Sequence, residues 1–211
     1  MNNFLDNIPT LPLAPWVESA MDWLTSNFSA FFNSNQQFGK LLMNQVTDLL
    51  ISIPAIILIL LVVIFAFFVS GKKLGLAAFS LIGLLFIYNQ GLWTHLMETT
   101  TLVIFSSIIS IIIGIPLGIL MSKSTVAENI IKPILDFMQT MPGFVYLIPA
   151  VAFFGIGIVP GVFASVIFAL PPTVRMTNLG IRQVPKELVE AADSYGSTAR
   201  QKLFKVEIPP C

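Results

Sequence analysis

Long apolar runs without a charge constrain this 211-residue chain more than any other feature. From Ile51 to Val69, nineteen consecutive residues are uncharged. As a helix this run extends about 28 Å, close to the roughly 30 Å thickness of a bilayer hydrocarbon core. The chain is 55% hydrophobic and only 10% charged, which lies outside the usual range of soluble domains. The sequence therefore predicts an all-α integral membrane protein, with its first crossing in this run.

The remaining apolar sequence predicts four more crossings. The second runs from about Leu74 to Leu92, and the third lies between Glu98 and Lys123. The uncharged interval between Asp136 and Arg175 is long enough for two, which separate at the glycine and proline cluster of residues 155–161. We therefore expect about five transmembrane helices.

The lysines and arginines predict the orientation, because these residues are retained on the cytoplasmic side of short loops. Threading five crossings puts ten of the eleven cations on one side, and Lys40 is the exception. The N-terminus is then outside, and the C-terminal segment is cytoplasmic. These positions divide the chain into an external region (1–50), two N-terminal crossings (51–98), a helical core (99–182) and a cytoplasmic segment (183–211).

The external region contains a predicted amphipathic helix from Pro15 to Phe32. Its aromatic and apolar residues recur at three- and four-residue spacing, opposite Glu18 and Asp22. Such a helix lies in the outer interface with its tryptophans at headgroup depth. The alternative is a helix that packs on the outer face of another subunit. We expect a polar linker from Asn33 to Gln37. The region does not read as a signal peptide, because no basic stretch precedes an apolar one.

The C-terminal segment is polar and rich in turn signals. Pro185 suits the first turn of a helix, Glu187 favours its positive end, and Gly196 can adopt the left-handed conformation that ends it. We expect a short helix from Pro185 to Tyr195.

A second helix is expected directly after this one. Thr198 is followed three residues later by Gln201, which predicts a capping box at the start of an amphipathic helix. Pro209 would close it. The segment is thus predicted to be a helix, a glycine corner and a helix.

The same segment resembles the EAA signature of ABC importer permeases. That signature reads Glu-Ala-Ala, three residues, Gly, nine residues, Ile, any residue, Leu-Pro. The matching residues here are Glu190, Ala191, Ala192, Gly196 and Pro209, whereas Val206 and Ile208 replace the Ile and the Leu. The resemblance implies that this segment, with Asp193 and Tyr195, docks on the ATPase. The alternative is an ordinary solvated cytoplasmic loop.

Two stretches, Pro133–Ala150 and Pro160–Thr177, resemble the corresponding helices of glycine betaine/proline-type osmoprotectant permeases. The resemblance runs from about Thr101 to Pro209. It implies the binding-protein-dependent importer permease (MetI-like) fold, incomplete here because family members continue with further helices after the EAA segment. It also implies a bacterial multi-pass membrane subunit that acts as a homodimer with an ATPase, which binds ATP, and an external solute-binding protein.

The first stretch also predicts part of a translocation path. Pro142 lacks a backbone donor inside an apolar helix, and a membrane tolerates such a break where it faces protein or a water-filled path. Gln139 and Thr140 would offer polar contacts there, and Phe144 and Tyr146 aromatic faces for a quaternary ammonium cation. The alternative is that these side chains pack and hydrogen-bond between helices.

Other functional classes lack their signals. No Gly-x-x-x-x-Gly-Lys-Ser/Thr loop is present, so the chain is not predicted to be an ATPase or another enzyme and needs no cofactor of its own. The single His95 does not make a metal site, and the zero net charge argues against binding nucleic acid. We therefore expect a permease subunit for glycine betaine or a related compatible solute. Two alternatives are a permease for an amino acid or a sulfonate, and a truncated, non-transporting membrane partner of a full-length permease.

Overall fold

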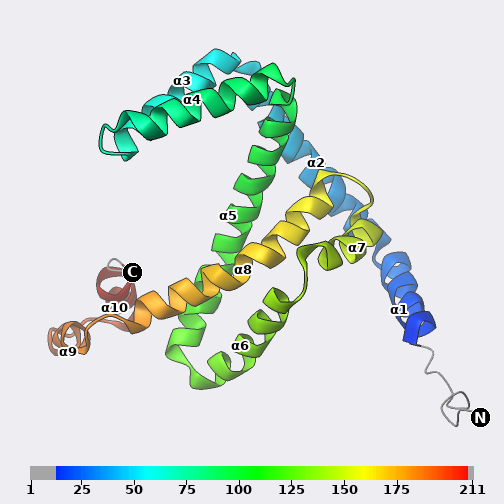
Figure 1. Cartoon of the computed structure of the whole chain (residues 1–211). Coiled ribbons are helices and arrows are strands. Elements are labelled where there is room, and N and C mark those ends of the chain that lie inside the picture. Colours follow the sequence, from blue (N-terminus) through cyan, green and yellow to red (C-terminus); the bar gives the residue numbers. More distant parts are fainter. Residues whose placement is uncertain (1–12, 209–211) are drawn as a thin grey trace, which may run out of the picture.

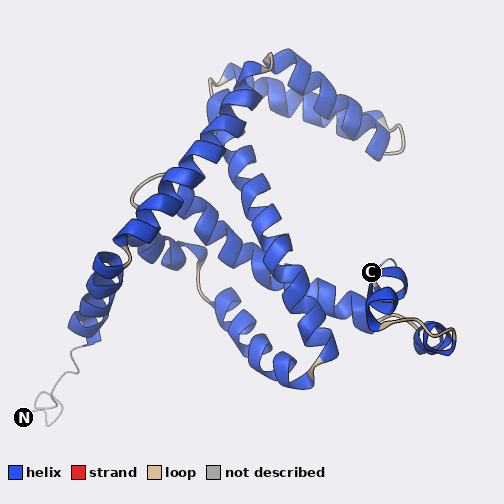
Figure 2. Cartoon of the chain, turned by 180° about the vertical axis from the view of Figure 1, so that it is seen from behind, coloured by secondary structure: helices blue, strands red, loops and turns tan. Residues whose placement is uncertain are grey.

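The computed structural model describes residues 13–208, which form helices joined by short loops (Figures 1 and 2). In chain order these are α1 (Leu13–Asn27), α2 (Ser29–Ser52), α3 (Ala55–Val69), α4 (Leu74–Asn89), α5 (Trp93–Lys123), α6 (Thr125–Thr140), α7 (Gly143–Phe154), α8 (Ile158–Arg182), α9 (Lys186–Ser194), α10 (Ala199–Lys202) and the π-helical turn η2 (Leu203–Glu207). For this part of the chain, the predicted all-α fold is confirmed.

The crossed pair α5 and α8 forms the centre of the molecule (Figure 1). On α5, small buried residues recur at every fourth position, at Ser106, Ser110, Gly114 and Gly118. A Cβ atom added to Gly118 would lie 2.5 Å from the Cβ of Thr177 on α8. Small residues let two membrane helices approach this closely, so that van der Waals contacts and polar contacts can hold them together. This small-residue stripe therefore explains why α5 and α8 pair.

Two sharp bends in the chain occur at proline. The axes of α2 and α3 meet at 90° and those of α6 and α7 at 95°. At each bend the residue before the proline is extended, with ψ of 127° at Ile53 and 138° at Met141. The proline ring disfavours the helical conformation in the residue that precedes it. Pro54 and Pro142 therefore account for both bends.

Helix lengths correct the predicted number of crossings. Within the described residues, α5 and α8 are each long and apolar enough to cross a membrane, and up to four crossings result if each bent pair is one span. With 15 and 16 residues, α3 and α4 extend only about 22 and 24 Å. The prediction of five crossings counted uncharged residues, whereas Pro54 and Pro142 shorten the helices within those runs, and a fifth crossing needs the shorter apolar helix α4 as well. The break predicted within residues 155–161 is confirmed, because α7 ends at Phe154 and α8 begins at Ile158.

The N-terminal region is more helical than predicted. The expected helix from Pro15 to Phe32 consists of α1 and the start of α2, which meet at Phe28. The predicted polar linker, Asn33–Gln37, is wrong because these residues lie inside α2. Tertiary contacts hold this helix in place. Phe32 stacks on Phe153 of α7 at 4.8 Å between ring centroids, and buried Thr47 hydrogen-bonds Thr101 of α5 at 2.9 Å.

The buried apolar core is small and lies where α5, α6 and α8 meet. Its centre is Met121, Leu135 and Val174, which are at most 2% exposed. Many large apolar side chains lie on the surface instead, including Ile56 and Phe65 of α3 and Phe79 of α4. The α3–α4 hairpin projects to one side of the molecule (Figure 1). An apolar surface of this extent is suited to lipid or to another membrane helix.

Candidate functional site

The helix predicted from Pro185 to Tyr195 is confirmed as α9, which begins at Lys186 and ends at Ser194. Gly196 ends it with φ of 71°, in the left-handed region that glycine adopts without strain. The Ser197 N–H donates to the carbonyl of Ala192, and the Gly196 N–H donates to that of Asp193, both at 3.0 Å. This pair of bonds is the Schellman motif, which satisfies the last carbonyls of a helix.

The predicted capping box is also present. The Thr198 N–H donates to the Gln201 side-chain carbonyl at 2.9 Å, and the Gln201 N–H donates to the Thr198 hydroxyl at 3.3 Å. It opens α10, which continues into η2. The Lys202 ammonium contacts both carboxylate oxygens of Asp193 at 2.7 and 2.9 Å. The two helices thus form one unit, which we call the helix–glycine–helix unit (residues 186–207). The predicted closing residue, Pro209, lies outside the described residues.

Most of the predicted docking residues are accessible on this unit. Glu190, Ala191, Asp193 and Gly196 are exposed, and Tyr195 is 91% exposed. Ala192 differs, since it is only 8% exposed. It lines a shallow hollow of about 570 Å³ between α9 and the following turns, together with Leu188, Tyr195 and Gln201. The unit therefore presents charged and aromatic side chains around a concave surface.

The last turn of α8 connects this unit to the membrane helices. Arg182 donates to the Glu128 carboxylate on α6 at 2.6 Å and to the Met121 carbonyl on α5 at 3.1 Å. About two turns earlier in α8, Arg175 forms an ion pair with Asp136 of α6. Sequence reasoning used Asp136 and Arg175 only as limits of an uncharged interval and missed both ion pairs. The sequence did contain a signal for them in its spacing. The two acids, Glu128 and Asp136, are eight residues apart, and the two arginines, Arg175 and Arg182, are seven residues apart, which is about two helical turns in each case.

The α6–α7 bend contains the residues predicted for the translocation path. Pro142 has no N–H to donate to the Met138 carbonyl, and the Tyr146 hydroxyl donates to that carbonyl instead, at 3.1 Å. The Thr140 hydroxyl similarly donates to the Phe137 carbonyl at 2.9 Å. The Tyr146 bond joins α7 to α6 across the bend, as the alternative interpretation of its role suggested, whereas the Thr140 bond lies within the last turn of α6. Gln139 is exposed on α6.

Phe144 occupies a different environment. It is 82% exposed and lines a hollow of about 380 Å³ between α5, α7 and α8. Phe168 and Ser165 of α8 line the same hollow, and sequence reasoning did not single them out. Neither Gln139 nor Thr140 is among its lining residues. Of the predicted path residues, Phe144 is therefore the one that meets a second aromatic side chain at a cavity.

Metal-ligating side chains do not gather in the described part of the chain. Residues 13–208 contain no group of three or more His, Cys, Asp or Glu side chains that could hold a metal ion. His95 contacts a Glu98 carboxylate oxygen through Nδ1 at 3.1 Å. The site that the geometry defines is the helix–glycine–helix unit, which follows α8 in the chain, and the ion pairs of Arg175 and Arg182 join α8 to α6. This arrangement is typical of the membrane subunit of a transporter.

Comparison with known proteins identifies the family. Residues 110–210 match the family described as "Binding-protein-dependent transport system inner membrane component". The glycine betaine/carnitine transport permease protein GbuB of Listeria monocytogenes (serotype 1/2a, strain 10403S) is 56% identical over 207 residues, covering 97% of this chain and 73% of that protein. The glycine betaine transport system permease protein OpuAB of Bacillus subtilis (strain 168) is 47% identical over 205 residues, covering 97% and 72%.

A third relative is the glycine betaine/proline betaine transport system permease protein ProW of Escherichia coli (strain K12), which is 43% identical over 199 residues. The alignment covers 94% of this chain and 56% of ProW. The chain belongs to the family of binding-protein-dependent transport system inner membrane components. It is a multi-pass permease subunit of an ABC importer and not its enzyme, and its partners are a binding protein and the ATPase that binds ATP.

Proposed function

We propose that the solute imported through this permease is glycine betaine or a related compatible solute. The observation that carries the proposal is the 56% identity, across 97% of the chain, to a permease named for glycine betaine and carnitine. Two further relatives, at 47% and 43% identity, are also named for betaines. The aromatic hollow of Phe144 and Phe168 supports this assignment, because aromatic faces attract quaternary ammonium groups.

The helix–glycine–helix unit is the proposed contact with the ATPase. It lies beyond the end of α8, away from the apolar surface of the α3–α4 hairpin (Figure 1). Glu190, Ala191, Asp193 and Tyr195 are accessible there, and Ala192, Gly196 and the Asp193–Lys202 ion pair fix the shape of the unit. ATP-driven movement of the ATPase would act on α9 and, through Arg182, on α5 and α6 together.

The proposed orientation places the N-terminus outside and this unit in the cytoplasm. It requires an odd number of crossings, so it counts the short apolar helix α4 as a fifth crossing beside the two long helices and the two bent pairs. The cations at residues 72–73, 123–132 and 175–205 then all lie on the cytoplasmic side. The four regions proposed from the sequence (1–50, 51–98, 99–182 and 183–211) depend on the same assignment of segments to the two sides of the membrane. A second copy of the permease is the proposed partner within the bilayer, since the exposed apolar surfaces of α3, α4 and α5 are available to it.

The coupling role can be tested by co-purification of the chain with the neighbouring ATPase in mild detergent. We expect the native chain to retain the ATPase and the Glu190→Ala, Gly196→Pro double variant to lose it. The matched control is Glu18→Ala with Gly91→Pro, because Gly91 is also left-handed, with φ of 70°, but lies in the α4–α5 corner. Equal loss in both variants would contradict a specific role for the unit.

The substrate can be tested by reconstituting the permease with its ATPase and binding protein in liposomes. Uptake of radiolabelled glycine betaine should be driven by ATP, and excess unlabelled carnitine should compete better than taurine or proline. ATP-driven uptake that taurine blocks and betaines do not would assign the permease to a sulfonate instead.

A further inference from the structure

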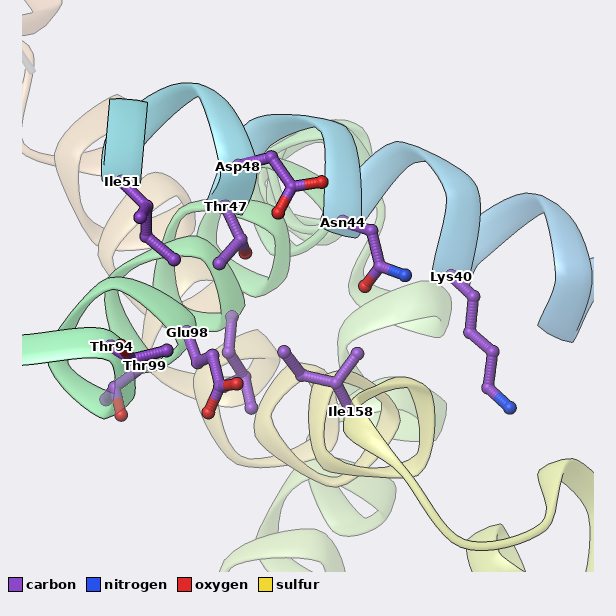
Figure 3. Close-up of a pocket in the computed structure, with 10 residues that line it drawn as sticks. Lys40, Asn44, Thr47, Asp48, Ile51, Thr94, Glu98, Thr99 and Ile158 are labelled. Atoms are coloured by element: carbon purple, nitrogen blue, oxygen red, sulfur yellow. The ribbon is translucent and has the colours of Figure 1, made fainter. Parts of the chain in front are cut away.

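A third cavity, larger than the two hollows described above, lies between α2, α5 and α8, away from the coupling unit. Its volume is about 820 Å³. Figure 3 shows its lining: Lys40, Asn44, Thr47, Asp48 and Ile51 from α2, Thr94, Glu98, Thr99 and Leu102 from α5, and Ile158 from α8. This volume lies within the range of about 300–1,000 Å³ that small-molecule sites occupy.

The cavity wall is built from regular helices. Lys40, Asn44, Thr47 and Ile51 are spaced by three or four positions and Asp48 follows Thr47 directly, so the α2 residues lie along one side of that helix (Figure 3). The buried Thr47–Thr101 hydrogen bond of 2.9 Å fixes this face against α5. Phe32, two turns before Lys40, stacks on Phe153 and holds α2 over the α7–α8 corner. The positions of the lining side chains are therefore set by packed helices, as a binding site requires.

Opposite charges are separated along this wall. Lys40 and Asp48 are eight residues apart, about 12 Å along the axis of α2. Figure 3 shows Lys40 at one end of the face and Asp48 and Glu98 toward the other. Among the described residues, neither Lys40 nor Asp48 makes an ion pair or a side-chain hydrogen bond, whereas Glu98 contacts His95. Asn44, between the two charges, adds both donors and an acceptor.

Lys40 is also exceptional in the sequence. It is the one cation of eleven that the charge distribution assigns to the outer side. The positive-inside rule makes lysine rare in outer loops, although water solvates its charge equally well on either side. Its stem lies beside Gly157 of the α7–α8 corner, since a Cβ on that glycine would lie 3.6 Å from Lys40 Cε. A single outer cation placed on a cavity wall, with two carboxylates further along, suits a ligand that carries both charges.

We propose that this cavity binds a small zwitterion, with the carboxylate toward Lys40 and Asn44 and the quaternary ammonium group toward Asp48 and Glu98. The inference rests on the proposed function, because it makes the cavity an outer vestibule for the imported solute. Leu102 lines both this cavity and the aromatic hollow of Phe144. The two cavities therefore adjoin at Leu102, so the aromatic hollow is the neighbouring site for a zwitterion released from the vestibule.

The test is a saturation-transfer NMR titration of the full chain in phosphatidylglycerol nanodiscs. The two probes are glycine betaine and choline, which has the cation but no carboxylate. Lys40→Gln should lower the affinity for glycine betaine about tenfold, the effect of losing a charge-assisted hydrogen bond, and leave choline unchanged. Asp48→Asn should weaken both probes roughly fivefold to tenfold. Lys40→Arg should retain glycine betaine binding.

The matched control is Lys132→Gln, which removes an exposed lysine of α6 outside the cavity. Equal effects of Lys132→Gln and Lys40→Gln, or no effect of Lys40→Gln, would overturn the proposal. A lipid headgroup that carries both charges is the other candidate occupant of the cavity. If glycine betaine affinity falls when phosphatidylethanolamine replaces phosphatidylglycerol, the cavity holds lipid, and the vestibule for solute is refuted. Retention of the ATPase by Lys40→Gln in co-purification separates failure of this inference from failure of the proposed function.

Discussion

Gly118→Ala tests whether the close approach of α5 and α8 holds the membrane core together. The added Cβ would lie 2.5 Å from Thr177 Cβ and 2.8 Å from the Val174 carbonyl oxygen. Neither neighbour is the end of a flexible side chain, so α8 has to move by roughly 0.5–1 Å to restore normal contact. Overpacking of this kind costs about 1–3 kcal/mol.

Gly83→Ala is the matched control, because nothing lies within 4 Å of the position that its Cβ would occupy on α4. Replacing glycine by alanine in a helix gains about 0.5–1 kcal/mol in either variant, so this gain cancels between them. We expect Gly118→Ala to be about 1–3 kcal/mol less stable than Gly83→Ala.

The assay is thermal unfolding in dodecyl maltoside, followed by circular dichroism, with retention of the ATPase as a second readout. Gly114→Ala should fall between the two variants, because its closest contacts, the Thr173 methyl at 2.8 Å and Cβ at 3.0 Å, are less close than the 2.5 Å contact at Gly118. Equal unfolding temperatures for Gly118→Ala and Gly83→Ala would refute the packing of α5 against α8.

Three further predictions address the bend, the arginine and the orientation. Tyr146→Phe removes the hydroxyl that donates to the carbonyl at the α6–α7 bend, and should lower the free energy of unfolding by about 1 kcal/mol in the same thermal assay. Arg182→Gln removes an ion pair and leaves the Met121 carbonyl with a weaker donor. ATP-driven uptake should therefore fall more than ATPase co-purification, and equal losses would contradict a role in transmission. In a Cys211→Ser background, an impermeant maleimide should label Asn33→Cys in intact cells and Ser197→Cys only after lysis, whereas the reverse pattern would invert the proposed orientation.

The helix–glycine–helix unit was predictable because its signals are local. Gly196 and the pair Thr198 and Gln201 each satisfy backbone groups within a few residues, so their spacing in the sequence determines the hydrogen bonds. The boundaries of α9 were consequently predicted to within one residue at each end. The hydrogen bond to the Met138 carbonyl was only partly predictable. The sequence shows that Pro142 cannot donate to this carbonyl, but the Tyr146 hydroxyl reaches it only because of the 95° bend.

The parts that the sequence did not reveal depend on tertiary contacts. Asn33–Gln37 reads as a linker by composition, yet it is helical because Phe32 packs on α7 and Thr47 bonds to α5 on either side of it. Likewise, the cavity charges Lys40 and Glu98 are 58 positions apart and line one cavity only after α2 folds along α5. An uncharged run also gives the length of apolar sequence but not that of the helix, which Pro54 and Pro142 shorten.

Helix α8 connects the charged cavity to the helix–glycine–helix unit, so a movement of one can reach the other through this helix. Ile158, the first residue of α8, lines the charged cavity, and Arg182, the last, connects to the coupling unit, about 36 Å away along the helix axis. The buried Ser and Gly stripe of α5 packs along α8 between them, and a close-packed helix pair does not compress. On the proposed coupling role, a force applied at α9 therefore displaces α5 and α8 together as one body. The cavity wall formed by α2 contacts α5 through the Thr47–Thr101 hydrogen bond, α7 through the Phe32–Phe153 stack and α8 where Gly39 lies beside Val159, so these are the contacts where opening and closing of the vestibule would take place.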